Sequence, residues 1–213
     1  MTEIAYDADH VKHSVGGKGG HIFRRGIHVG MCIVPWLYYE FADTWSSYLD
    51  LNRIQFAAGI GIAFISIEFV RLYFGITIVG QREYEAKQFS ALAWGGLSIA
   101  LVFVTLDSMT KPVGVHDGWL TIPLILSLTF GDPVMGEVRR YGMAPRAVFL
   151  VGSSVVFVTW LACWHFFSTP LFMAFIMGPL TTAAEWPKLK WIDDNATMVL
   201  IPLAAVLFIS PFL

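Results

Sequence analysis

The chain is built from apolar segments of membrane-spanning length, separated by short clusters of charged residues. A helix that crosses a bilayer core needs about 20 apolar residues, with roughly 17 to 25 tolerated. Seven segments approach this length, and they cover residues 27–42, 54–78, 89–106, 118–130, 147–167, 169–184 and 196–213. The fourth and sixth are short and contain Pro123 and Pro179, so one or two spans are expected to be short, broken helices. The sequence therefore predicts an all-α, polytopic transmembrane bundle of about seven helices.

The composition excludes a soluble domain with an ordinary core. Hydrophobic residues make up 56% of the 213 residues, and charged residues make up only 14%. The charges form no basic face or tail, so no nucleic-acid partner is expected. Cys32 and Cys163 both lie within apolar segments and predict neither a disulfide nor a redox motif. We expect residues 1–23 to form a polar cytoplasmic tail, since they contain no apolar signal segment, and residues 24–213 to form a single transmembrane domain.

The distribution of Lys and Arg predicts the orientation, because cytoplasmic loops of membrane proteins collect these residues. With seven spans and a cytoplasmic amino terminus, twelve of the 14 basic residues fall inside: Lys12, Lys18, Arg24, Arg25, Arg71, Arg82, Lys87, Arg139, Arg140, Arg146, Lys188 and Lys190. Arg53 and Lys111 fall outside. Removing one span would move later basic clusters to the other side. The charge pattern thus favours seven spans and places most of the polar clusters at the cytoplasmic face.

The first two polar clusters allow structural and functional interpretations. Arg24 and Arg25 lie four and three residues before His28, so all three can share one patch of a helix. The arginines are either anchors at the membrane surface or a clamp that binds the oxygens of a polyphosphate. In the second cluster, Glu68 and Arg71 are three residues apart, which predicts a structural ion pair inside the bundle.

The third cluster, GDPVMGEVRRYG, follows the fourth apolar segment. Asp132 followed by Pro133 is typical of a helix start, so we expect a new short helix that ends near Gly142. A helix cap explains the aspartate alone. It leaves Glu137, Arg139 and Arg140 unexplained, and such interleaved acids and bases are typical of a site for metal and phosphate.

The fourth cluster lies in the connection before the last span and is the most informative. Its polar residues are Glu185, Lys188, Lys190, Asp193, Asp194 and Asn195. A helix start needs one capping side chain, which Asp194 or Asn195 can supply. The remaining carboxylates repel one another at a membrane edge unless a cation or basic residues neutralise them. Mg²⁺ prefers one or two carboxylates together with substrate phosphates, so the cluster predicts a magnesium–phosphate site.

In this order, the four clusters resemble those of the membrane-embedded lipid alcohol kinases that use CTP. This family includes dolichol kinase, phytol kinase and CTP-dependent diacylglycerol kinase, and is related to the cytidylyltransferases that form CDP-lipids. The matching stretches are RRGIH, EFVR, REYE, GDPVMGEVRRYG, AAEW and IDDN. The resemblance implies a transmembrane catalytic domain that transfers the terminal phosphate of CTP to a polyprenol-, dolichol- or diacylglycerol-like alcohol. It also implies Mg²⁺ as cofactor and a lipid that enters from the bilayer.

We assign expected roles on this basis. The expected magnesium ligands are Asp132, Asp193, Asp194 and Glu185. The expected catalytic residues are Asp132, Asp193, Asp194 and His28, of which one carboxylate or the imidazole accepts the alcohol proton. The residues expected to bind the nucleotide phosphates are Arg24, Arg25, Arg139, Arg140, Lys188, Lys190 and Asn195. Such a site needs no covalent nucleophile, because phosphoryl transfer depends on positioning and charge neutralisation.

Several alternatives stay open from the sequence. A cytidylyltransferase, in which a lipid phosphate attacks the innermost phosphate of CTP, needs the same residues. ATP or another nucleotide can replace CTP, since the chain has no Walker A, protein-kinase or Rossmann motif. A transporter or a non-enzymatic membrane subunit is a different class, although transporters usually place ionisable groups near the bilayer midplane. The lipid and the oligomeric state, a homodimer included, are also open.

Overall fold

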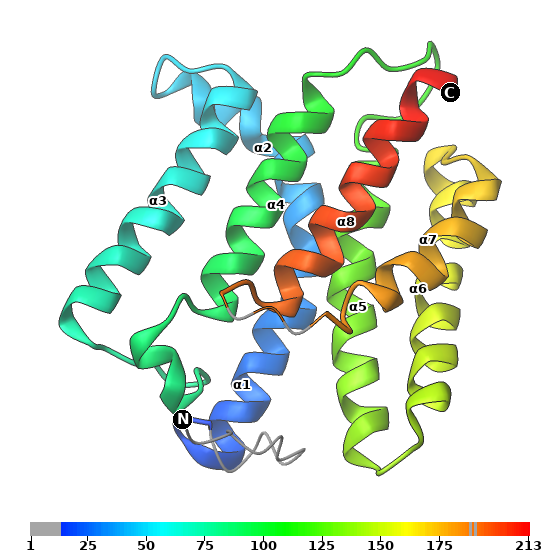
Figure 1. Cartoon of the computed structure of the whole chain (residues 1–213). Helices are drawn as coiled ribbons and strands as arrows, with labels where there is room; N and C mark the ends of the chain where they lie inside the picture. Colours follow the sequence, from blue (N-terminus) through cyan, green and yellow to red (C-terminus); the bar gives the residue numbers. More distant parts are fainter. Residues whose placement is uncertain (1–13, 188, 190) are drawn as a thin grey trace.

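The computed structural model describes residues 14–187, 189 and 191–213, which form an all-α bundle (Figure 1). Most of the predicted tail, together with Lys188 and Lys190, lies outside the described residues. The α-helices are α1 (Gly17–Gly30), α2 (Val34–Ser47), α3 (Arg53–Phe74), α4 (Ala91–Asp107), α5 (Thr121–Arg140), α6 (Pro145–Phe167), α7 (Leu171–Ala183) and α8 (Asp194–Ile209). Short 3₁₀ helices are η1 (Met31–Ile33), η2 (Glu83–Lys87) and η3 (Ser210–Phe212).

Within the described residues, three helical segments are long and apolar enough to cross a membrane. They are α3, α6 and α8 extended by η3, with 22, 23 and 19 residues. The helices α4 and α7 are also apolar but have only 17 and 13 residues. The all-α prediction is confirmed, and the three long apolar segments point to a multi-pass membrane protein.

The helix α5 differs from the sequence prediction. It is continuous, with Pro133 in its interior, so Asp132 does not begin a helix and the prediction of a separate short helix is wrong. Pro133 cannot donate to the carbonyl four residues earlier. The neighbouring helix α1 binds backbone carbonyls on both sides of this defect. Arg25 Nη1 donates to Pro133 O at 2.5 Å, and His28 Nε2 lies 3.2 Å from Leu128 O.

Smaller differences have local causes. The predicted span 27–42 is divided by η1, which separates α1 from α2. The predicted span 54–78 ends early because Gly75 adopts a left-handed conformation with φ of 62° and terminates α3. Pro123 is the third residue of α5 and does not break it, because the first N–H groups of a helix have no intrahelical partner. Pro179 lies inside α7, which is the short helix that was expected.

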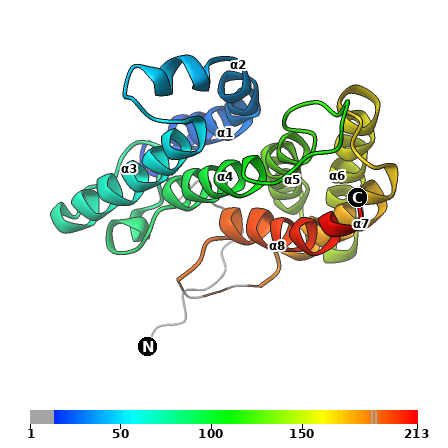
Figure 2. The same ribbon diagram turned by 90° about the horizontal axis from the view of Figure 1, so that it is seen from above.

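The core surrounds α5. Seen from above, α3, α4, α5 and α6 follow one another, with α2 on one side and α8 on the other (Figure 2). The helix α6 packs closely against α5 and α7, while α8 packs against α4 and α5. Trp160 of α6 is fully buried, and its indole N–H donates to Ser127 Oγ of α5 at 2.9 Å. This satisfied polar contact fixes α6 against the central helix.

The two ends of the bundle carry different charges. We call the end that contains the α5–α6 turn, residues 141–144, the basic end; it is the lower end in Figure 1. The start of α1, the end of α3 and the segment between α3 and α4 also lie in this half. Of the described basic residues, Arg53 and Lys111 belong to segments at the opposite end. This separation follows the split that the sequence predicts for the two sides of the chain.

Candidate metal centre

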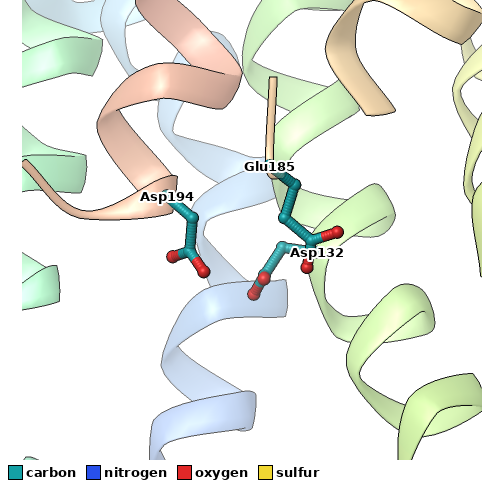
Figure 3. Close-up of side chains that lie close together, drawn as sticks. All are labelled: Asp132, Glu185 and Asp194. Carbon is teal, nitrogen blue, oxygen red and sulfur yellow. The ribbon is translucent and has the colours of Figure 1, made fainter. Parts of the chain in front are cut away.

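Three carboxylates from different segments converge near the first turn of α8 (Figure 3). Asp132 lies in α5, Glu185 follows the end of α7, and Asp194 is the first residue of α8. Each offers one oxygen, and these oxygens all lie within 4.8 Å of one another. Opposite ligands of an octahedral Mg²⁺ ion are about 4.2 Å apart. Neighbouring ligands of such an ion are closer, about 3 Å apart, and three ligands cannot all lie opposite one another. The three oxygens would therefore have to draw closer together to share the ion.

Local structure explains why Asp194 is available to this group. Asp193 is the N-cap of α8, and its side chain accepts a hydrogen bond from the N–H of Asn195 at 3.1 Å. The sequence-based expectation that Asp194 or Asn195 caps the helix is therefore wrong. Since Asp193 takes the capping position, the side chain of Asp194 turns toward the other two carboxylates (Figure 3).

Glu185 is the most buried member of the group, with 5% of its surface exposed. Its Oε1 accepts a hydrogen bond from Arg139 Nη2 at 2.9 Å. Its Oε2 is buried and has no hydrogen-bond partner among the described residues. Burial raises the pKa of Glu185 to about 7; Arg139 acts against this rise, while Asp132 and Asp194 add to it. A cation beside Oε2 would supply the partner that this oxygen lacks.

Asp193 lies beside the group without belonging to it. Burial raises its pKa well above the usual value, and the adjacent Asp194 raises it further, while Arg24 has the opposite effect. Arg82 is close enough to interact electrostatically with both aspartates. Two neighbouring carboxylates in a poorly hydrated place disfavour each other's ionisation, so the segment as a whole favours a nearby positive charge.

His28 connects α1 to the metal centre. The side chain is buried, and its Nε2 lies 3.6 Å from Asp132 Oδ2 and 3.2 Å from Leu128 O. Because a carbonyl oxygen can only accept a hydrogen bond, Nε2 carries the hydrogen and cannot take a proton from a substrate. His28 is therefore placed to orient Asp132.

The two arginines of α1 have protein partners. Arg24 Nη1 donates to Oε1 of the buried Glu85 at 2.9 Å. Arg25 Nε lies 3.2 Å from Glu137 Oε1, in addition to its hydrogen bond with the backbone of α5. Both guanidinium groups thus hold α1 against neighbouring segments. The structure does not direct either of them toward the three carboxylates.

The arginines of α5 differ from each other. Arg139 reaches the metal centre through Glu185, and 39% of its side chain is exposed. Arg140 lies 3.5 Å from Glu137 and has 52% of its side chain exposed. Both keep exposed surface that can meet an incoming phosphate. Of these two, Arg139 is the one that contacts a carboxylate of the metal centre.

Asn195 occupies a different position from the one expected of a phosphate-binding residue. The side chain is 5% exposed. Its Nδ2 donates to Ala91 O at 3.3 Å, which fixes the orientation of the amide. Its Oδ1 is buried and, within the described residues, receives no hydrogen bond. An acceptor without a donor suits an O–H or N–H group rather than a phosphate oxygen.

Glu68 and Arg71 lie away from the metal centre. Arg71 donates from Nε and Nη2 to the two carboxylate oxygens of Glu68 at 2.9 and 2.7 Å. Glu68 also accepts from the N–H of Ser90, and Arg71 donates to the carbonyls of Ile76 and Gln88. This buried pair joins the end of α3 to the start of α4.

Sequence reasoning gave no role to Glu85, Glu137 or Arg82. The first two pair with the arginines of α1, and the third interacts with the aspartates before α8. Their signal was present as acids and bases alternating within REYE and GEVRR. The partners within each alternation depend on the packing of α1, which the sequence pattern does not specify.

Comparison with known proteins adds no relative. No protein-family model matches the chain, and no curated protein or solved structure is significantly similar to it. A set of oxygen-only ligands beside the partly exposed Arg139 has the chemistry to bind a divalent cation together with a phosphate group.

Proposed function

We propose that the protein is a membrane-embedded lipid alcohol kinase, which transfers the terminal phosphate of a nucleoside triphosphate to the hydroxyl of a lipid. The observation that carries this proposal is the convergence of Asp132, Glu185 and Asp194 from three segments within 4.8 Å. The resemblance of RRGIH, GDPVMGEVRRYG and IDDN to the CTP-dependent family favours CTP as the donor.

The residues present fit Mg²⁺. The ligand set consists of carboxylate oxygens, which this cation prefers, and the unpartnered Oε2 of Glu185 is the orphaned acceptor that a cation would satisfy. Asp132, Glu185 and Asp194 would hold the ion. When bound, Mg²⁺ offsets the negative charge of the nucleotide phosphates and of the group being transferred.

In the proposed reaction, Arg139 and Arg140 bind phosphate oxygens at the basic end, and His28 keeps Asp132 in place. The alcohol oxygen forms a bond to the terminal phosphorus. The bond between that phosphorus and the oxygen bridging to the next phosphate breaks, and the nucleoside diphosphate leaves with the bonding electron pair. The alcohol proton passes to a carboxylate of the site.

We place this site at the cytoplasmic edge of the membrane. The support is the concentration of Lys and Arg in the half of the bundle in which α3 ends and α4 and α8 begin (Figure 1). In this arrangement α4, α5 and α7 cross the membrane together with the three segments named above, and α1 with α2 makes a divided seventh crossing. The lipid reaches the site sideways from the bilayer.

A label-transfer experiment tests the reaction. Purified protein is incubated with Mg²⁺ and CTP that carries radioactive phosphorus at either the terminal or the innermost position, and with a lipid alcohol or the corresponding lipid phosphate. Terminal label in the alcohol product is expected. Innermost label in a product of the lipid phosphate, with release of pyrophosphate, would identify a cytidylyltransferase instead. Label in neither lipid would reject both.

A matched pair of variants tests the metal centre. Asp194→Asn should lower the transfer rate by at least about 100-fold, because the amide is a poor ligand and cannot neutralise the cation. Asp43→Asn is the control, since Asp43 lies in α2, has 74% of its side chain exposed and is remote from the carboxylates. Equal rates in the two variants would contradict the role of the carboxylate group.

A further inference from the structure

A small cavity with an apolar rim lies beside the metal centre. It has a volume of about 50 Å³ and lies among α1, residues 78–81, the start of α4 and the start of α8. The rim is made of apolar side chains that are between 38% and 54% exposed, namely Ile27, Ile78, Val79 and Leu92. In a membrane protein, such a rim faces lipid more readily than water.

Asn195 lines this cavity and contributes an unsatisfied acceptor. Its amide cannot simply be reversed, because the hydrogen bond from Nδ2 to Ala91 O would be replaced by two oxygens facing each other. A buried acceptor without a hydrogen bond destabilises the protein, so a ligand that donates a hydrogen bond to Oδ1 would bind favourably here. A hydroxyl group is the simplest ligand that donates here.

The other polar side chains of the cavity have partners. Arg24 is bonded to Glu85, His28 Nε2 lies against the carbonyl of Leu128, and Gln81 Oε1 accepts from the N–H of Ile78. Among the fully buried side-chain atoms of the described lining, the unsatisfied one is thus an acceptor. A ligand with one O–H and an otherwise apolar body matches this pattern.

We propose that this cavity receives the hydroxyl end of a single-chain primary alcohol, with Asn195 Oδ1 accepting the hydrogen bond from its O–H. The inference rests on the proposed kinase function and names the alcohol it uses. A volume of about 50 Å³ is far below the roughly 300–1,000 Å³ of sites that enclose drug-sized ligands. A nucleotide does not fit, whereas a hydroxymethyl group and the first carbons of a chain do.

The same geometry disfavours a diacylglycerol. Its hydroxyl stands one carbon away from the first of two ester groups, and these would need donors within or beside an apolar rim. A polyprenol-like alcohol carries only hydrocarbon behind its hydroxyl. The chain can leave across the exposed rim into the bilayer, while the hydroxyl sits beside Asn195, one residue from the metal-centre carboxylate of Asp194.

Two substitutions at one position test the cavity. Gly95 lines it, and a methyl group added there would lie 3.9 Å from Asn195 Cβ, an ordinary contact. Gly95→Ala should therefore fold and keep most of the space, whereas Gly95→Leu fills it. We expect Gly95→Leu to raise KM for the alcohol by about tenfold relative to Gly95→Ala, with KM for the nucleotide unchanged.

Asn195→Ala removes the acceptor, so we expect kcat/KM for the alcohol to fall by roughly three- to tenfold. In the wild type, a single-chain polyprenol should be phosphorylated with a kcat/KM at least about tenfold above that of a diacylglycerol. Preference for diacylglycerol, or an unchanged KM for the alcohol in Gly95→Leu, would overturn the inference and leave the kinase function in place.

A binding measurement separates the two proposals. A long-chain alcohol with a photoreactive diazirine in its first carbons is irradiated with the wild-type protein in lipid nanodiscs, and the labelled residues are mapped by mass spectrometry. Label in α1, η1 and α4 around Ile27, Met31 and Leu92, reduced in Gly95→Leu, supports the cavity. Label confined to α5 and α6 overturns it. Cavity labelling without any phosphate transfer would reject the kinase function but retain the alcohol site.

Discussion

At the scale of single residues, two buried oxygens without partners stand on either side of Asp194 in the sequence. Glu185 Oε2 and Asn195 Oδ1 receive no hydrogen bond from the described residues. Each such atom destabilises the folded protein by an amount of about 1 to 3 kcal/mol. The two atoms favour different ligands, because a carboxylate oxygen binds a cation and an amide oxygen accepts a hydrogen bond from a hydroxyl. The site therefore combines weak local stability with two specific ligand requirements.

Glu185 leads to a prediction about pH and stability. Its folded pKa of about 7 lies above the ordinary value of 4.5, so the folded state holds this proton more tightly and stability falls as pH rises from about 4.5 to 7. The loss above pH 7 is at most about 3 kcal/mol. Without Mg²⁺, Glu185→Gln should be more stable than the wild type at pH 8 and similar at pH 5.

Thermal unfolding in detergent at both pH values measures this difference. Adding Mg²⁺ at pH 8 should then raise Tm of the wild type and leave Tm of Glu185→Gln nearly unchanged. If Glu185→Gln were less stable than the wild type at pH 8 without metal, burial of the ionised Glu185 carboxylate would not destabilise the protein, and the prediction would be wrong.

The neighbours Asp193 and Asp194 allow a second comparison. Asn caps helices as well as Asp does, so Asp193→Asn should keep α8 intact and change the Mg²⁺ affinity by less than about threefold. Asp194→Asn should lower that affinity by at least about tenfold. Isothermal titration with Mg²⁺ measures both values. An equal loss in the two variants would make Asp193 a ligand as well.

The sequence predicted the acidic residues of the site better than the arrangement around them. Asp132, Glu185 and Asp194 were all expected near a metal, because adjacent carboxylates at the end of an apolar segment need compensation. The pairing of Arg24 with Glu85 was not predictable, since it depends on how α1 packs against the segment before α4. The same packing decides that His28 Nε2 donates and does not accept.

At the scale of helices, α5 is central because it contacts α1, α6 and α8 and carries Asp132. Its interior proline is held by side chains of α1 that bind carbonyls of α5. This is why the Asp-Pro pair, usually a helix start, failed as a boundary signal here. The apolar segments predicted that the helices exist. The ends of the helices were less predictable, because an end such as Gly75 depends on the backbone conformation.

The connection between α3 and α4 provides a test at this scale. Glu68→Ala would leave Arg71 buried without its carboxylate and remove the acceptor for the N–H of Ser90. We expect a loss of about 3 to 5 kcal/mol in the free energy of unfolding. Glu40→Ala, on the exposed surface of α2, is the control and should change stability by less than about 0.5 kcal/mol. Denaturant unfolding measures both, and similar losses would contradict the structural role of the pair.

At the scale of the whole molecule, the bundle separates its chemistry from its opposite end. The carboxylates, the exposed arginines of α5 and the alcohol cavity lie in the half that collects Lys and Arg, while the α2–α3 and α4–α5 connections lie at the other end. The sequence predicted this sidedness from charge counts alone. It did not predict that, within the described residues, three helical segments would be both long and apolar enough to cross a membrane.

Cysteine labelling tests the orientation. In a background without Cys32 and Cys163, single cysteines are introduced at Val113, between α4 and α5, or at Met143, in the α5–α6 turn; both positions are exposed. A membrane-impermeant maleimide should label Val113→Cys in intact cells, and Met143→Cys only after the membrane is opened. Labelling of both from outside would contradict the proposed sidedness.

The uninterrupted course of α5 has a consequence for turnover. From Asp132 to its end at Arg140 the helix continues for eight residues, which is about 12 Å or roughly two turns. The phosphate would thus be attached well beneath the surface of the basic end. The nucleoside triphosphate would have to cross this distance from the basic end to reach the carboxylates, and the nucleoside diphosphate would have to return along it, whereas the lipid would enter and leave at the membrane edge.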